Sequence, residues 1–162
     1  MGRKDRLNYY LDIAETVMLR STCLRRRYGA IIVKSDEIIA TGYNGAPRGR
    51  KNCLDRNTCM RDELEIPSGE RYELCRSVHA EANAIISASR RDMMGATLYL
   101  SGIDAKTGEL LDDTIPCSMC RRLIINSGIE QTICRVSGGK HIVIHTRDWV
   151  FNDDSILDNT QF

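Results

Sequence analysis

Two short stretches decide how this chain folds: VHAEANAI at residues 78–85 and PCSMC at residues 116–120. Together they contain one imidazole, two thiols and one carboxylate that need not bind a metal. Three protein ligands with the fourth position left for water are the arrangement of catalytic zinc sites, whereas structural zinc sites are closed by four ligands. The remaining carboxylate is then available to carry protons. The two stretches therefore predict a catalytic metal centre at which distant segments meet.

Both stretches are expected to open helices. Cys117 and Cys120 are three residues apart, and side chains at this spacing share a helix face, so both sulfurs can reach one ion. Pro116 suits the start of a helix, and the amino end of a helix favours thiolate over thiol. Side chains two apart on a regular helix do not face the same way. We therefore expect His79, two residues before Glu81, at or before the first regular turn of its helix.

Hydrophobic periodicity organises the rest of the chain. Helical spacing predicts helices at residues 5–20, 80–90, 116–127 and 149–157. Apolar runs of strand length predict five strands, at residues 29–33, 38–41, 97–100, 131–136 and 140–145. A helix and a hairpin followed by alternating helices and strands indicate a three-layer α-β-α sandwich with a mixed five-stranded sheet. The metal ligands would then lie near the carboxyl ends of strands, where open α/β sheets usually bind ligands.

Composition limits the class of protein. The 162 residues fit one domain, with an insertion at about 46–76 that is rich in Gly, Pro and charges. A net charge of +1 does not suggest a protein built to bind nucleic acid. No stretch resembles a signal peptide or a membrane span. Seven cysteines without such a signal favour a reducing, cytoplasmic compartment, and their odd number excludes complete pairing.

The metal motif is part of a wider resemblance. The pattern H-x-E…P-C-x-x-C is the signature of zinc-dependent base deaminases. Over residues 7 to about 136 the chain resembles the cytidine and deoxycytidylate deaminase superfamily, and within it the deoxycytidylate (dCMP) deaminases. The stretches that carry this resemblance are Arg20-Ser21, YGAIIV at 28–33, GYNGAPRG at 42–49 and VHAEANAI at 78–85. The GYNG part favours dCMP over other substrates.

The resemblance implies zinc-dependent hydrolysis of dCMP to dUMP and ammonia, a step toward thymidylate in pyrimidine deoxynucleotide metabolism. It implies that His79, Cys117 and Cys120 hold the catalytic zinc and that Glu81 is the general acid/base. The candidates for substrate binding are Asn44, Ala80, Arg20 and Arg48. The asparagine occupies the family's sugar- and base-contacting position. The two arginines are candidates for the 5′-phosphate, because a guanidinium matches phosphate geometry.

A second, structural zinc is a further expectation, because some dCMP deaminases carry one in the same region. Cys53, Cys59 and Cys75 lie in the insertion, and Cys23 or a histidine could complete four ligands. A metal would stabilise an irregular, charged segment that has little apolar surface to bury. Free buried thiols and a labile disulfide are the competing interpretations.

Several alternatives stay open. A deaminase of free cytidine, deoxycytidine or cytosine, or of tRNA adenosine, would use the same chemistry, although a tRNA enzyme should show a basic surface. A non-catalytic zinc module would close its metal site and leave Glu81 without a role. Members of the family are often homo-oligomers and some are regulated by dCTP and dTTP, so a homo-oligomer is expected here and the two nucleotides are candidate effectors. The segment at 102–115 is longer than in many relatives and could cover the pocket or contact a subunit.

Overall fold

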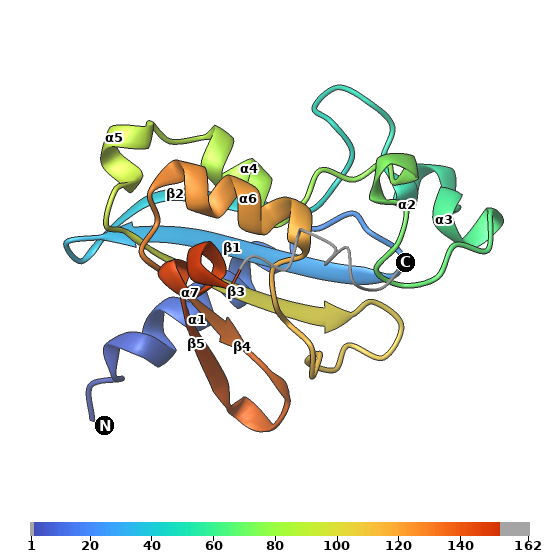
Figure 1. Cartoon of the computed structure of the whole chain (residues 1–162). Coiled ribbons are helices and arrows are strands. Elements are labelled where there is room, and N and C mark those ends of the chain that lie inside the picture. Colours follow the sequence, from blue (N-terminus) through green and yellow to red (C-terminus); the bar gives the residue numbers. More distant parts are fainter. Residues whose placement is uncertain (1, 153–162) are drawn as a thin grey trace.

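Strand β1 (Arg26–Lys34) is buried on both faces, which explains the layered architecture. Its apolar side chains alternate, so that Ala30 and Ile32 belong to one core cluster while Ile31 and Val33 belong to the other. The computed structural model describes residues 2–152, and helices cover both faces of its sheet (Figure 1). This three-layer arrangement confirms the predicted fold class.

The sheet has five strands in the order β2-β1-β3-β4-β5. Strands β2 (Glu37–Tyr43) and β3 (Thr97–Asp104) both run antiparallel to β1. Strand β4 (Gln131–Arg135) is parallel to β3, and β5 (His141–His145) is antiparallel to β4. The predicted mixed sheet is therefore confirmed. At the β1–β2 turn, Ser35 and Asp36 have φ of 51° and 66°, the positive values that a type I′ hairpin requires.

One face of the sheet is covered by α1 (Arg6–Met18), which buries Tyr10, Leu11 and Ala14. The opposite face is covered by α4 (Ala80–Ile86) and α6 (Ser118–Ser127), which lie side by side (Figure 1). Gly42 permits the close approach of α4, because a Cβ at Gly42 would lie 2.3 Å from the carbonyl oxygen of Ala80. The helices that begin with the metal motifs are thus packed directly on the sheet.

The predicted helix at 80–90 is too long. Helix α4 ends at Ile86, and a separate helix α5 (Arg90–Met93) begins after Ser89. The reason is capping, since the Ser89 hydroxyl accepts a hydrogen bond from the backbone N–H of Asp92. The predicted helix at 149–157 is also displaced. Helix α7 (Thr146–Phe151) begins earlier, and residues 153–157 lie outside the described residues.

The insertion at residues 46–76 has little regular structure. It contains two one-turn helices, α2 (Cys53–Arg56) and α3 (Met60–Glu63), and the 3₁₀ turn η1 (Tyr72–Leu74). Only Cys53 and Arg61 are buried in it. A second 3₁₀ turn, η2 (Ser137–Gly139), joins β4 to β5. The insertion is therefore held by something other than an apolar core.

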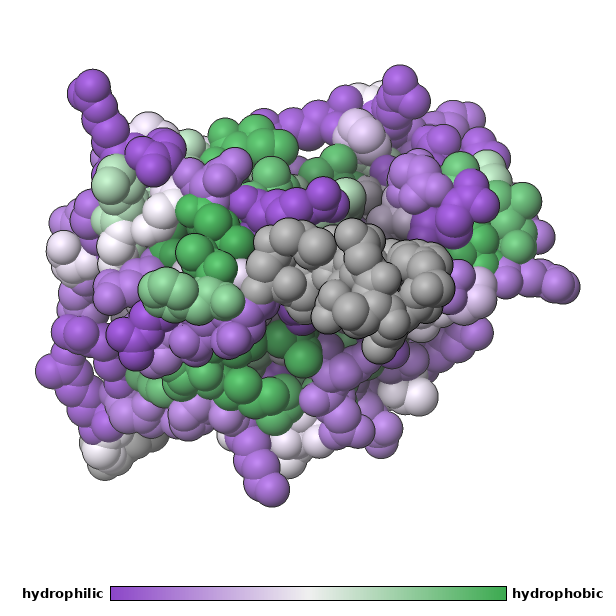
Figure 2. Space-filling view, in the orientation of Figure 1, coloured by the Kyte–Doolittle hydropathy of each residue, from purple (hydrophilic) through white to green (hydrophobic). Residues whose placement is uncertain are grey.

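Hydrophobic side chains also reach the surface. Figure 2 shows them gathered over the α4–α6 layer and again over the β4–β5 hairpin, and the exposed apolar side chains of α4 and α6 include Ile86, Met119 and Leu123. The longest helix within residues 2–152 has 13 residues. None of the helices there combines the length and the apolar character that crossing a membrane requires.

Candidate active site

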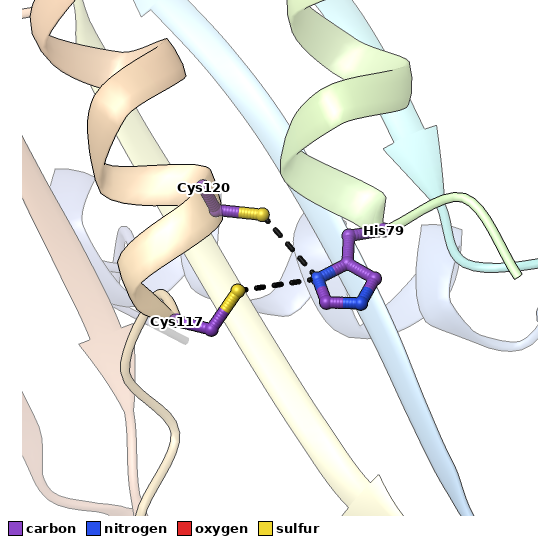
Figure 3. Close-up of side chains that lie close together, drawn as sticks. All are labelled: His79, Cys117 and Cys120. Carbon is purple, nitrogen blue, oxygen red and sulfur yellow. Dashed lines mark hydrogen bonds between the residues drawn. The ribbon is translucent and has the colours of Figure 1, made fainter. Parts of the chain in front are cut away.

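The side chains of His79, Cys117 and Cys120 meet between the amino ends of α4 and α6 (Figure 3). His79 is the N-cap residue of α4 and Cys117 is the N-cap residue of α6. His79 Nδ1 lies 3.5 Å from Cys117 Sγ and 3.3 Å from Cys120 Sγ. Because an N-cap residue precedes the regular turn, His79 and Glu81 can both face the site although they are only two residues apart.

The three donors fit a zinc ion. In a tetrahedral site with bonds of about 2.3 Å to sulfur and about 2.0–2.1 Å to nitrogen, a nitrogen and a sulfur lie about 3.6 Å apart. The two nitrogen–sulfur distances here are 3.5 and 3.3 Å. Two sulfurs and one imidazole are also ligands that zinc prefers. Among the described residues no fourth His, Cys, Asp or Glu joins this group, which matches a site with three protein ligands.

The two thiols differ in their tendency to ionise. A hydrogen bond with Cys120 lowers the pKa of Cys117 to about 4, and a hydrogen bond with His79 adds to this effect. The same hydrogen bond with Cys117 raises the pKa of Cys120, and burial raises it further. The two thiols thus share a proton, and a bound cation would favour the thiolate form of both.

Glu81 is the buried carboxyl group of the site. It lies in the first turn of α4, is only 5% exposed, and lines the same pocket as His79 and Cys117. Burial raises the pKa of Glu81. A carboxyl group with a raised pKa holds a proton more readily than a free carboxyl group, which favours the proton delivery that a general acid/base performs.

The pocket beside Glu81 is lined by three arginines: Arg25, Arg26 and Arg61. Arg25 pairs through Nε with Asp62 at 3.2 Å, while its Nη1 is buried and has no hydrogen-bond partner among residues 2–152. Arg26 is paired with both carboxylate oxygens of Asp113, at 3.2 and 3.0 Å. The unpartnered nitrogen of Arg25 is therefore suited to an anionic ligand.

The predicted phosphate ligands lie elsewhere. Arg20 and Arg48 are both exposed and do not line this pocket. Sequence reasoning missed the pocket arginines, although the run of three arginines at residues 25–27 was a signal for them. The structure places Arg25 and Arg26 of that run at the pocket and leaves Arg27 outside it. The segment at 102–115 also contributes, because Ile115 lines the pocket.

Asn44 lines the pocket, but most of the hydrogen bonds of its side-chain amide are made to neighbouring parts of the chain. Its Oδ1 accepts hydrogen bonds from Ser21 Oγ at 2.6 Å and from the backbone N–H of Tyr28 at 2.7 Å. Its Nδ2 donates to the carbonyl oxygen of Arg26 at 2.9 Å. One amide N–H therefore remains for a ligand. Ala80 is completely buried at the start of α4.

The other candidate cysteines share one region without forming a compact ligand group. Cys23, Cys59 and Cys75 line the pocket, and Cys53 is buried. Burial raises the pKa of Cys53, and the other three cysteines raise it further. No three of these sulfurs lie within 4.8 Å of one another in the described part of the chain. All seven cysteines are unpaired.

Known proteins resemble this chain in both sequence and fold. Residues 4–136 match the cytidine and deoxycytidylate deaminase zinc-binding region. The deoxycytidylate deaminase of Mycobacterium phage D29 is 40% identical over 138 residues, which are 82% of this chain and 96% of that enzyme. The deoxycytidylate deaminase of Schizosaccharomyces pombe is 34% identical over 131 residues, which are 80% of this chain but only 37% of that enzyme.

Solved structures agree with this relationship. The crystal structure of dCMP deaminase from the cyanophage S-TIM5 in complex with dCMP and dUMP has a TM-score of 0.55 and 25% identity, and the match covers 83% of this chain and 84% of that chain. Cytidine deaminase from Burkholderia pseudomallei has a TM-score of 0.53 at 16% identity, over 87% of this chain and 93% of that chain. The second match shows a shared fold only.

Proposed function

The chain belongs to the cytidine and deoxycytidylate deaminase family, and on that premise we propose that it hydrolyses dCMP to dUMP and ammonia. The observation that carries this proposal is a three-donor metal group directly beside a buried glutamate, in a pocket that also contains an unpartnered guanidinium nitrogen. In a structural metal site closed by four protein ligands, that glutamate would have no catalytic role. The deoxycytidylate deaminases among the relatives, including the phage D29 enzyme, support the same substrate.

His79, Cys117 and Cys120 would hold the zinc. Zinc, when bound, acts as a Lewis acid and lowers the pKa of its water molecule to about 7. Glu81 would accept a proton from the attacking water and deliver it to a nitrogen of the cytosine ring. It would then take the proton of the hydroxyl group newly added to the ring and pass it to the amino group, which leaves as ammonia. The buried position of Glu81 keeps this carboxyl group out of bulk solvent and suits both directions of proton transfer.

Arg25 is our candidate for the 5′-phosphate. A buried N–H without a partner costs about 1–3 kcal/mol, and a phosphate oxygen would remove this penalty. A nucleoside, which has no phosphate, would leave Arg25 Nη1 unsatisfied. The pocket therefore favours a nucleotide over a nucleoside.

A substrate panel tests the proposed function. Ammonia release should be fastest with dCMP and much slower with deoxycytidine, cytidine and a single-stranded oligonucleotide. Replacing Arg25 by Met should raise KM for dCMP by about 10- to 150-fold, the loss of one hydrogen bond to a charged group. The matched control is Arg27→Met, because Arg27 belongs to the same run but does not line this pocket. Faster turnover of the nucleoside or the oligonucleotide would refute the proposal.

We propose a second zinc ion held by Cys23, Cys53, Cys59 and Cys75. Support comes from their shared location and from the irregular segment that they would join. The side chains would have to move together to close the group, because no three of the sulfurs lie within 4.8 Å of one another in the described residues. The number of zinc ions per chain distinguishes this site from free thiols.

We also propose that the chain is one deaminase domain that forms a homo-oligomer in the cytoplasm. The single sheet with a core on each face supports one domain. The exposed apolar side chains of Ile86, Met119 and Leu123 support subunit contacts, and the unpaired cysteines support a reducing compartment. Light scattering after size exclusion, with and without dCTP and dTTP, would measure the subunit number and detect any change in it that either nucleotide causes.

A further inference from the structure

We propose that Tyr72 is a positioning residue for His79, and that Arg61 holds Tyr72 in place from inside the insertion. This inference rests on the part of the proposed function that assigns zinc to His79. It gives the insertion at residues 46–76 a role in the metal site, although none of the three metal donors lies in it. The supporting observation is a chain of contacts that runs from Arg61 through Tyr72 to the imidazole.

The first contact joins the two rings. The ring centroids of Tyr72 and His79 are 5.0 Å apart and the ring planes meet at 89°, so one ring presents its edge to the face of the other. Aromatic pairs of this geometry contribute about 0.5–1.5 kcal/mol beyond the burial of their area. Since the orientation of the imidazole decides whether Nδ1 points at the two sulfurs, a ring packed against it restricts the motion that would misplace this donor.

The need for such a contact follows from the hydrogen bonds of His79. A metal-binding histidine usually donates its second ring N–H to a carboxylate or a backbone carbonyl, which fixes the ring. Within residues 2–152, Nδ1 of His79 faces Cys117 and Cys120, and Nε2 has no such partner. Tyr72 lies beside the ring instead. An aromatic contact thus takes the place of the usual orienting hydrogen bond.

The second contact joins Tyr72 to Arg61. The guanidinium carbon of Arg61 lies 4.7 Å from the centroid of the Tyr72 ring, within the range of a cation–π interaction. Arg61 is only 7% exposed. Its Nη2 donates to the carbonyl oxygens of Pro67 at 2.6 Å and Glu70 at 2.8 Å. One buried guanidinium therefore holds the loop that leads into η1 and also the ring that η1 presents to His79.

The experiment measures metal retention and does not depend on deaminase activity. Zinc-loaded protein is mixed with a chromophoric chelator and the rate of zinc release is followed. The cobalt-substituted protein reports the ligand geometry through its absorption spectrum. Four variants are compared with the wild type: Tyr72→Phe, Tyr72→Leu, Arg61→Lys and Glu73→Gln. The last is the matched control, because Glu73 lies in the same turn, is exposed and pairs only with Arg71 among the described residues.

We expect Tyr72→Leu to weaken zinc retention by about 10- to 100-fold, the effect of losing an outer partner of a metal ligand, and to alter the cobalt spectrum. Tyr72→Phe should retain zinc like the wild type, because it keeps the ring, and Glu73→Gln should do the same. Arg61→Lys should release zinc several-fold faster, since an ammonium group cannot reproduce the fork of a guanidinium.

The proposal would be overturned if Tyr72→Leu released zinc at the wild-type rate and had the cobalt spectrum of the wild type. If Tyr72→Leu does not fold, wild-type release in Arg61→Lys would overturn it instead. The outcome is separate from that of the substrate panel. A protein that shows the expected dependence on Tyr72 but deaminates nothing would refute only the proposed function. An active dCMP deaminase whose zinc is insensitive to Tyr72 would refute only this inference.

Discussion

Helices α4 and α6 are anchored on the sheet by Ala80, Ala84 and Ile124, all completely buried, whereas the insertion at residues 46–76 buries only Cys53 and Arg61. The helices carry the metal donors and Glu81, while the insertion carries one wall of the pocket. Apolar packing tolerates little displacement. A segment held by a few polar contacts depends strongly on each of them. The reaction chemistry and the placement of the metal donors should therefore be sensitive to the packing of the helix layer. The insertion should affect ligand binding and zinc retention through its individual polar and aromatic contacts.

The largest effect is expected at Glu81. Replacing it by Gln keeps the shape of the side chain but removes the group that carries protons. The rate of ammonia release from dCMP should fall by about 10²- to 10⁴-fold, while the zinc content stays unchanged, because Glu81 is not one of the three donors. Zinc analysis and steady-state kinetics on the same preparation measure both. Loss of zinc with activity retained would contradict the role given to Glu81.

The next effect tests the packing of the helix layer. In Gly42→Ala, the new Cβ would lie 2.3 Å from Ala80 O and 2.4 Å from Ala84 N, which are backbone atoms that cannot turn aside. We expect a loss of about 3 kcal/mol in the free energy of unfolding and weaker zinc retention, because α4 must move.

The matched control for this packing test lies in the insertion. At Gly69 a Cβ would meet no atom within 4 Å, although φ is +89°, so Gly69→Ala should lose about 1 kcal/mol through backbone strain alone. Urea titration measures both variants. Equal zinc retention in the two would mean that the helix layer is not the rigid part of the site.

A smaller effect is expected from the cysteines of the insertion. Cys53→Ser should reduce the zinc content from two ions per chain to one and leave the catalytic ion in place, because Cys53 is not among its donors. Metal analysis of freshly purified protein is the measurement, and Cys134→Ala, in the buried sheet, is the control. If the wild type contains one zinc ion per chain, and this ion is lost in Cys117→Ser, the proposed second site is refuted.

The smallest effect is expected at the surface ion pair between Arg26 and Asp113. The two side chains are 38% and 60% exposed, and such pairs contribute at most about 1 kcal/mol. Asp113→Asn should therefore shift the unfolding midpoint only slightly and leave dCMP turnover near that of the wild type. A large loss of turnover would show that this pair positions the segment ending at Ile115, which lines the pocket.

Sequence patterns determined the parts of this protein that depend on local spacing. Cys117 and Cys120 lie within one helical turn, so their shared direction follows from helix geometry alone. The strand positions follow from apolar runs of strand length. The run at residues 30–33 is apolar throughout because Ala30 and Ile32 face one core and Ile31 and Val33 face the other. The break at Ser89 was missed, because a capping hydroxyl and an alanine-rich helix compete over the same few residues.

Only the tertiary structure decided which groups surround the pocket. Arg25 lines it while Arg20 does not, although they are five residues apart. The contact between Tyr72 and His79 likewise depends on the path of the insertion, which no periodic pattern describes. The physical reason is that spacing along a helix or strand determines direction only within that element. A pocket joins side chains from several elements, and their distances depend on how the whole chain packs.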